Sequence, residues 1–199
     1  LGTGPKSYEF EKNFSNYTKS KYSLALNSCT AAIFLTLKYL GLKRGDEVIT
    51  TPLTFCSTVS SIIHVGATPV LADISYETLN IDPQEIEKNI TKKTKALIIV
   101  HFAGKICDMK SIRKICNKYN LFLIEDCAHA IETKLNNKSA GTFGDFGCFS
   151  FYVTKNLSTG EGGMIISKKK RAIHELRTLS LHGMDRDAWK RYGKSGFKH

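Results

Sequence analysis

The sequence predicts an α/β protein of three layers, in which a mostly parallel sheet carries helices on both faces. Short apolar segments alternate with amphipathic segments of about a dozen residues, which is the pattern of a doubly wound fold. Residues 96–100 and 121–124 are continuous apolar runs bounded by polar residues, as expected of strands buried on both faces. No internal repeat, low-complexity segment or linker interrupts the pattern, so residues 1–199 are expected to form a single domain.

Capping residues and apolar spacing predict the remaining elements. Ser7 can cap a first helix whose apolar face includes Phe10 and Phe14. Asp82 begins a capping box with proline at the first helical position, and Asp108 can cap a longer helix. Two more helices are expected to open within residues 28–32 and 51–55. Further strands are expected at residues 22–27, 48–50, 69–72, 148–154 and 164–166.

Composition places the chain among ordinary globular proteins. Apolar residues make up 42% and charged residues 24%, and no apolar run approaches the roughly 20 residues of a membrane span. The first residues lack the basic-then-apolar pattern of a signal peptide, so a cytoplasmic protein is expected. The six cysteines form no C-x-x-C pair and no zinc-ligand spacing, so we expect reduced, mostly buried thiols and no metal site.

The net charge of +11 raises the possibility of a nucleic-acid partner. The basic residues do not form one long tract, however, and cluster mainly at residues 168–171 and 186–198. The first cluster begins a predicted helix and should face solvent. The second could instead meet a small molecule that carries a diphosphate. We therefore expect no nucleic-acid partner.

Three chemically useful positions stand where predicted strands end. These are the Ser28-Cys29-Thr30 segment, Asp126 and Lys155. In a parallel sheet such ends share one edge, so an anion site at a helix N-terminus, a carboxylate and an amine would converge. Taken singly, Ser28 could equally be a simple N-cap, and Lys155 could be a solvated lysine at the end of a strand. Taken together, they suit a ligand with a phosphate, a basic ring nitrogen and an aldehyde, which describes pyridoxal 5'-phosphate (PLP).

Nine short motifs extend this constellation over nearly the whole chain. In order they are Gly2-Thr3-Gly4-Pro5, Asn27-Ser28-Cys29-Thr30-Ala31-Ala32, Gly45-Asp46-Glu47-Val48-Ile49, Pro52-Leu53-Thr54-Phe55, His101-Phe102-Ala103-Gly104, Glu125-Asp126-Cys127-Ala128-His129-Ala130, Gly144-Asp145-Phe146-Gly147-Cys148-Phe149-Ser150-Phe151, Thr154-Lys155-Asn156 and Gly160-Glu161-Gly162-Gly163. Together they resemble the DegT/DnrJ/StrS family of nucleotide-sugar aminotransferases. That family belongs to the fold-type I PLP enzymes, which resemble aspartate aminotransferase.

The resemblance implies a role for each matching residue. Lys155 would be the catalytic lysine that forms a Schiff base with PLP. Asp126 would pair with the pyridine nitrogen, where a carboxylate keeps the ring protonated and able to accept electrons. Ser28, Thr30 and Ser150 would hold the phosphate.

The same resemblance surrounds the cofactor ring with four further residues. Phe55 would stack on one face of the ring, and Ala128, being small, would let the ring lie against the other. His129 matches the residue usually found beside Ala128, where a structural hydrogen bond and a substrate contact are equally compatible with the sequence. Cys29 would flank the cofactor without acting as a nucleophile, because no base is supplied.

The implied reaction moves an amino group from an amino acid, with L-glutamate the expected donor, to a nucleotide-linked keto-deoxysugar. Such reactions serve polysaccharide, glycan and antibiotic sugar synthesis. Two alternatives remain: a PLP-dependent sugar dehydratase of the same family, in which histidine replaces the lysine, and a non-catalytic regulatory or interaction fragment. The resemblance further implies a homodimer with shared active sites. It also implies a PLP-binding large domain truncated at both ends, without the family's smaller C-terminal domain.

Overall fold

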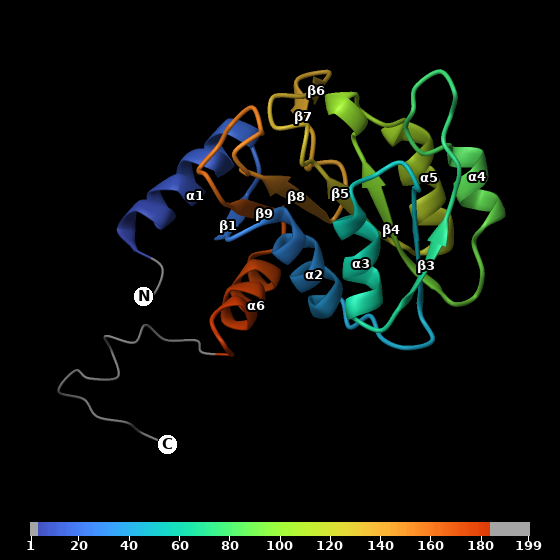
Figure 1. Ribbon diagram of the computed structural model, residues 1–199, viewed down its shortest axis with the longest axis horizontal. Helices are drawn as coiled ribbons and strands as arrows, with labels where there is room; N and C mark the ends of the chain where they lie inside the picture. Colours follow the sequence, from blue (N-terminus) through green and yellow to red (C-terminus); the bar gives the residue numbers. More distant parts are fainter. Residues whose placement is uncertain (1–3, 184–199) are drawn as a thin grey trace.

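The computed structural model describes residues 4–183, which are built around a seven-stranded sheet (Figure 1). The strand order across the sheet is β1-β9-β8-β5-β4-β2-β3. Its strands are β1 (Tyr22–Leu26), β2 (Glu47–Thr50), β3 (Thr68–Leu71), β4 (Thr94–Val100), β5 (Phe122–Asp126), β8 (Phe146–Ser150) and β9 (Gly163–Ser167). A separate hairpin pairs β6 (Lys134–Leu135) with β7 (Lys138–Ser139).

Strand direction decides which side chains meet at the sheet edge. Strands β3, β2, β4, β5 and β8 pair in parallel, whereas β9 is antiparallel to both of its neighbours, β8 and β1. Strand β1 therefore runs in the same direction as the parallel set. The carboxyl ends of β1, β5 and β8 consequently lie at one edge of the sheet, together with the first residue of β9.

Helices cover both faces of the sheet (Figure 1). Apolar side chains of α2, α3 and α6 pack on one face, and those of α4, α5 and α1 pack on the other. Neighbouring residues of β4 alternate between the two cores, since Ile98 joins the first and Leu97 and Ile99 join the second. The helices are α1 (Pro5–Thr18), α2 (Cys29–Tyr39), α3 (Cys56–His64), α4 (Pro83–Lys88), η1 (Phe102–Gly104), α5 (Met109–Tyr119) and α6 (Lys170–Ser180).

The three-layer α/β architecture expected from the sequence is confirmed, with three local corrections. The strand expected at residues 148–154 is β8 (Phe146–Ser150), so Lys155 lies in the loop after it and not at its end. Ser7 does not cap the first helix, because Pro5 occupies the first helical position and Gly4 is the N-cap. Asp82 does cap α4 by accepting from the Gln84 N–H at 2.8 Å. The reciprocal half of the capping box is absent, since the Asp82 N–H bonds to the Asp73 carbonyl instead. Asp108 caps α5 as expected.

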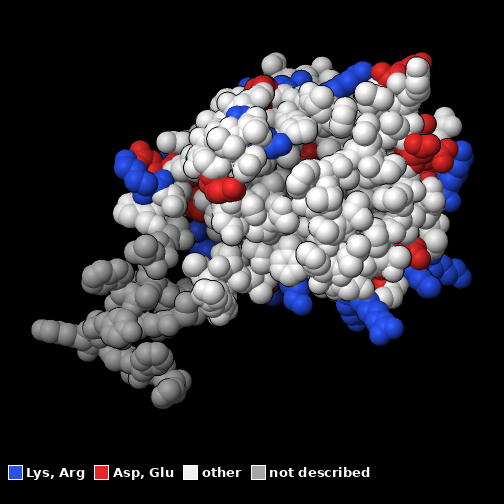
Figure 2. Space-filling view, viewed as in Figure 1, with Lys and Arg blue, Asp and Glu red and all other residues white. Residues whose placement is uncertain are grey.

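The cysteines and charged side chains are distributed much as predicted. All six cysteines are free thiols, and only Cys56 is exposed. Residues 168–171 are exposed around the start of α6, whereas the basic residues 186–198 lie outside the described residues. Figure 2 shows one face of the molecule in the same view as Figure 1. Lysine and arginine side chains lie mainly around its margin, with few charges over α2 and α3. Among residues 4–183 no helix is long and apolar enough to cross a membrane.

Candidate active site

A cavity of about 430 Å³ opens at the edge of the sheet where β1, β5 and β8 end. Three segments distant in sequence meet there because their strands run in the same direction and deliver their next residues to the same edge. All nine residues that the sequence singled out for cofactor binding line this cavity: Ser28, Cys29, Thr30, Phe55, Asp126, Ala128, His129, Ser150 and Lys155.

The N-terminus of α2 forms one wall of the cavity. Ser28 is the N-cap, and its hydroxyl accepts from the Ala31 N–H at 3.1 Å. The N–H groups of Cys29 and Thr30 open the helix and have no carbonyl partner within it. Together with the positive end of the helix dipole, they make this wall suitable for an anion.

Gly163, the first residue of β9, lies against the same helix terminus. A Cβ atom at this position would overlap the Ser28 carbonyl and the Cys29 nitrogen. Only glycine allows β9 to pass so close to the start of α2. The glycine-rich stretch that ends at Gly163 therefore serves the close packing of this wall.

Asp126 lies deep in the cavity at the end of β5, and its side chain is buried. One carboxylate oxygen accepts from the Ala128 N–H at 3.0 Å, and the other accepts from the Thr58 hydroxyl at 2.9 Å. Burial raises the pKa of Asp126, and these two hydrogen bonds oppose the rise by favouring the charged form. The cavity thus offers a fixed carboxylate to a ligand that can donate a proton to it.

Lys155 approaches from the loop that joins β8 to β9. Its backbone N–H bonds to the Tyr152 carbonyl at 2.9 Å, and its side chain is half-buried in the cavity wall. The neighbouring Asn156 side chain donates to Glu132, which lies beyond Asp126 in the chain. Desolvation, followed by the nearby Lys155 charge, lowers the pKa of His129. A neutral imidazole is therefore favoured beside the lysine.

Two apolar residues shape the space between these polar groups. Phe55 is the N-cap residue of α3; it lines the cavity, and the residue is 75% exposed. Ala128 also lines the cavity and packs against the core beneath α2 and α3. An aromatic side chain so exposed has surface left for a flat ligand to cover.

Sequence reasoning missed several side chains of this site. Thr58 was not singled out because a threonine within a helix gives no sign of its partner, although Thr54 and Thr58 at helical spacing form a polar stripe. The remaining cavity-lining residues were also not assigned roles: Thr54, Ser57, Val100, Tyr152, Thr154, Glu161 and Gly162.

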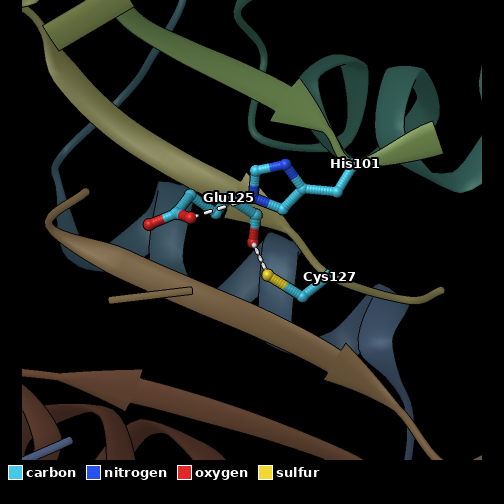
Figure 3. Close-up of side chains that lie close together, drawn as sticks. All are labelled: His101, Glu125 and Cys127. Atoms are coloured by element: carbon cyan, nitrogen blue, oxygen red, sulfur yellow. Dashed lines mark hydrogen bonds and ion pairs between the residues drawn. The ribbon is translucent and has the colours of Figure 1, made fainter. Parts of the chain in front are cut away.

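A second polar cluster lies buried beside the site, where His101, Glu125 and Cys127 bring possible metal-ligand atoms within 4.8 Å of one another (Figure 3). The atoms already have partners. His101 Nδ1 accepts from the Cys107 N–H at 3.2 Å, so Nε2 carries the proton and donates it to Glu125 at 2.9 Å.

Glu125 also accepts from the Gly141 N–H at 2.8 Å and the Gly144 N–H at 2.5 Å. Burial raises the pKa of the Cys127 thiol well above its ordinary value, which keeps it protonated and a poor metal ligand. This cluster is therefore a structural hydrogen-bond network that fixes the strand carrying Asp126.

The cavity matches the needs of PLP in its donor set. It combines a helix N-terminus for a phosphate, a buried carboxylate for a ring nitrogen, an amine for an aldehyde and an exposed aromatic ring. No other cofactor needs to be invoked to explain why these four groups occur together.

Comparison with known proteins gives a consistent assignment. The model of the DegT/DnrJ/EryC1/StrS aminotransferase family matches residues 1–198. The spore coat polysaccharide biosynthesis protein SpsC of Bacillus subtilis is 51% identical over 98% of this chain and 50% of its own length. The GDP-perosamine synthase of Vibrio cholerae is 40% identical over 92% of this chain and 49% of its own length.

Solved structures agree with this assignment. An aminotransferase from Psychrobacter cryohalolentis superposes with a TM-score of 0.92 at 37% identity, covering 99% of this chain and 50% of its own. The PLP form of Spr1654 from Streptococcus pneumoniae gives 0.86 at 36% identity, with 92% and 52% covered. The chain spans about half the length of the curated relatives it matches. The chain belongs to the DegT/DnrJ/EryC1/StrS aminotransferase family.

Proposed function

We propose that this chain is the PLP-binding large domain of a homodimeric sugar aminotransferase, and that the complete enzyme transfers an amino group from L-glutamate to a nucleotide-linked keto-deoxysugar. The observation that carries the proposal is the meeting of Lys155, Asp126 and the N-terminus of α2 in one cavity. Each supplies a group that PLP-dependent amine transfer needs, and the three come from the end of β5, the loop after β8 and the start of the helix after β1.

Each residue has a distinct task in this proposal. The N–H groups of Cys29 and Thr30, with the hydroxyls of Ser28 and Ser150, would bind the phosphate. Phe55 and Ala128 would hold the two faces of the ring. Bound PLP supplies an electron sink for the electrons left when a proton is removed from the substrate carbon.

Two groups would act on protons. Lys155 would anchor the cofactor through its Nζ and, once released by the incoming amine, take a proton from the substrate carbon and return it to the cofactor. Asp126 would hold the ring nitrogen protonated through its buried carboxylate. His129 lines the cavity, and its lowered pKa favours the neutral imidazole, which can form a hydrogen bond within the protein or with the substrate.

The sugar substrate is supported by the relatives. The Vibrio cholerae relative is a GDP-perosamine synthase, whose name indicates an amino sugar carried on a nucleotide. The name of SpsC places that protein in spore coat polysaccharide synthesis. Lys155 favours amine transfer over the dehydratase alternative, because dehydratases of the family carry histidine at that position. The six free cysteines support a reducing compartment, in agreement with the proposed cytoplasmic location.

A homodimer is supported by apolar side chains exposed near the cavity. Tyr152, Val153 and Leu157, on the loop that carries Lys155, are 45%, 61% and 41% exposed. A partner subunit that covers this loop would remove them from water and complete the wall of the site.

Covalent trapping tests the proposal. Borohydride treatment of the PLP-loaded full-length protein should attach the cofactor to the peptide that contains Thr154-Lys155-Asn156. Lys155→Ala should abolish both the adduct and turnover, while Lys43→Ala, an exposed lysine outside the cavity, should leave both unchanged. L-glutamate should convert the loaded protein to its amine form, and a nucleotide-linked keto-sugar should reverse the change. An adduct at another lysine, or an active Lys155→Ala enzyme, would overturn the assignment.

A further inference from the structure

Thr58 is fully buried on α3 behind the wall of the cavity, which it does not itself line. Its hydroxyl donates to an Asp126 carboxylate oxygen at 2.9 Å and is the only side-chain hydroxyl within residues 4–183 recorded on that carboxylate. The Ala128 N–H bonds to the other oxygen at 3.0 Å, and the Cys29 thiol lies 3.9 Å from that same oxygen. Each oxygen of the carboxylate therefore has a hydrogen-bond donor.

A second threonine, Thr54, extends this hydrogen bond toward the cavity. Thr54 precedes the N-cap residue of α3, and its hydroxyl lies 2.8 Å from the hydroxyl of Thr58. Since an ionised Asp126 can only accept, Thr58 donates to it, and its lone pairs are left to accept from Thr54. Successive hydrogen bonds of this kind polarise and strengthen one another. Thr54 lines the cavity, so the chain of hydroxyls runs from the cavity surface to the carboxylate.

We propose that Thr58 is a positioning residue which, supported by Thr54, fixes the orientation of Asp126 and keeps the negative charge on it. This inference rests on the proposed function, since it concerns the carboxylate assigned there to the ring nitrogen. A carboxylate without this donor would bind a proton more tightly. The proton shared with a ring nitrogen would then move toward Asp126, and the ring would lose part of its power to accept electrons.

Few groups around Asp126 favour its charged form. Burial favours the neutral acid and is the largest influence on its pKa, which is raised, while the Ala128 and Thr58 hydrogen bonds act against it. Electrostatic influences of His129 and His101 also oppose the rise but rank below those hydrogen bonds. The thiols of Cys29 and Cys148 face the carboxylate from α2 and β8, and burial keeps both protonated.

The test compares Thr58→Val with Thr58→Ser in the full-length protein loaded with PLP labelled with ¹⁵N at the ring nitrogen. Valine keeps the shape of threonine and removes the hydroxyl, whereas serine keeps the hydroxyl. Thr58→Val should retain the borohydride adduct at Lys155 and move the ¹⁵N resonance toward that of the unprotonated ring. It should also lower kcat roughly tenfold, which corresponds to the loss of one hydrogen bond to a charged group. Thr58→Ser should restore both. Thr18→Val, a buried threonine of α1 that donates to the Phe14 carbonyl, is the matched control and should change neither.

Three results would decide against the proposal. A wild-type ¹⁵N resonance and rate in Thr58→Val would show that the hydroxyl is not needed, and an equal loss in Thr58→Ser would show that the methyl group matters instead. If Thr58→Val does not fold, Thr54→Val is measured in its place. A ¹⁵N shift in the same direction supports the chain of hydroxyls, and an unchanged resonance overturns the proposal. Absence of the Lys155 adduct in the wild-type protein would instead overturn the proposed function itself.

Discussion

Glu125 and Asp126 are adjacent buried carboxylates on one strand, and their surroundings differ in nearly every respect. Glu125 points into the layer beneath η1 and the loop before β8, where three N–H groups from His101, Gly141 and Gly144 surround it. Asp126 points to the opposite face and lines a cavity, with hydrogen bonds from Ala128 and Thr58.

The difference separates a structural carboxylate from one available for chemistry. A buried charge with a full set of donors and no cavity beside it stabilises the strand and the loops that it joins. A buried carboxylate that lines a cavity, as Asp126 does, can still bind a ligand. Its pKa is raised because burial disfavours the charged form. One step along β5 is enough to change the role, because successive side chains face opposite sides of a sheet.

Removing Glu125 should give the largest change in stability. Glu125→Ala leaves the His101 Nε2–H and two backbone N–H groups buried without an acceptor, so the free energy of unfolding should fall by about 4 kcal/mol. Urea denaturation of the full-length protein measures it. Glu9→Ala, at an exposed ion pair on α1, should change it by less than about 0.5 kcal/mol. A small loss at Glu125 would remove its structural role.

Asp126→Asn should affect catalysis rather than folding. The amide keeps the shape of the side chain but cannot hold a ring nitrogen protonated, so kcat should fall roughly a hundredfold, the equivalent of one charge-assisted contact of about 3 kcal/mol. Steady-state kinetics with glutamate and a keto-sugar measure the change. Near wild-type turnover, with the fold intact, would take Asp126 out of the proposed mechanism.

The same substitution should slightly stabilise the protein without cofactor. Burial raises the folded-state pKa of Asp126 above its ordinary value of 3.8, so the wild-type protein loses stability as the pH rises from that value through the raised one. Asp126→Asn lacks this loss and should be the more stable protein at pH 7, with the difference disappearing in acid. Thermal unfolding at a series of pH values from 3.8 upward checks it. A gain that did not depend on pH would point to packing instead.

The sequence was sufficient to predict the layers and the three strand ends that form the cavity. The apolar runs of β4 and β5 are buried on both faces as expected. A polar residue marks the edge of the sheet in each case, His101 directly after β4 and Asp126 at the end of β5. The residues before Lys155 likewise identify β8, although that strand ends at Ser150, before the predicted boundary. Strand existence is visible in sequence because burial selects for apolar, branched side chains.

Other features depend on contacts between distant residues and could not be predicted in the same way. Nothing in residues 164–166 indicates that β9 is antiparallel to its neighbours, because apolar side chains suit either direction. Thr58 and Glu125 were unassigned for a similar reason, since their partners Asp126 and His101 come from other elements. Helix capping by Ser7 was wrong because Pro5 begins the helix earlier.

The pairing of β1 with β9 has a consequence for how the chain acquires its fold. Within residues 4–183, strand β1 lies at an edge of the sheet and pairs only with β9, from which it is separated by most of that stretch of chain. Residues 22–26 can therefore gain no strand partner during synthesis until residues 163–167 have left the ribosome. The start of α2, which follows β1 directly, is fixed against Gly163 at the same late stage. Pairing β1 with β9 requires closing a long loop, which costs conformational entropy before any contact forms. Folding of this region should therefore be slow and should follow the assembly of β2, β3, β4 and β5.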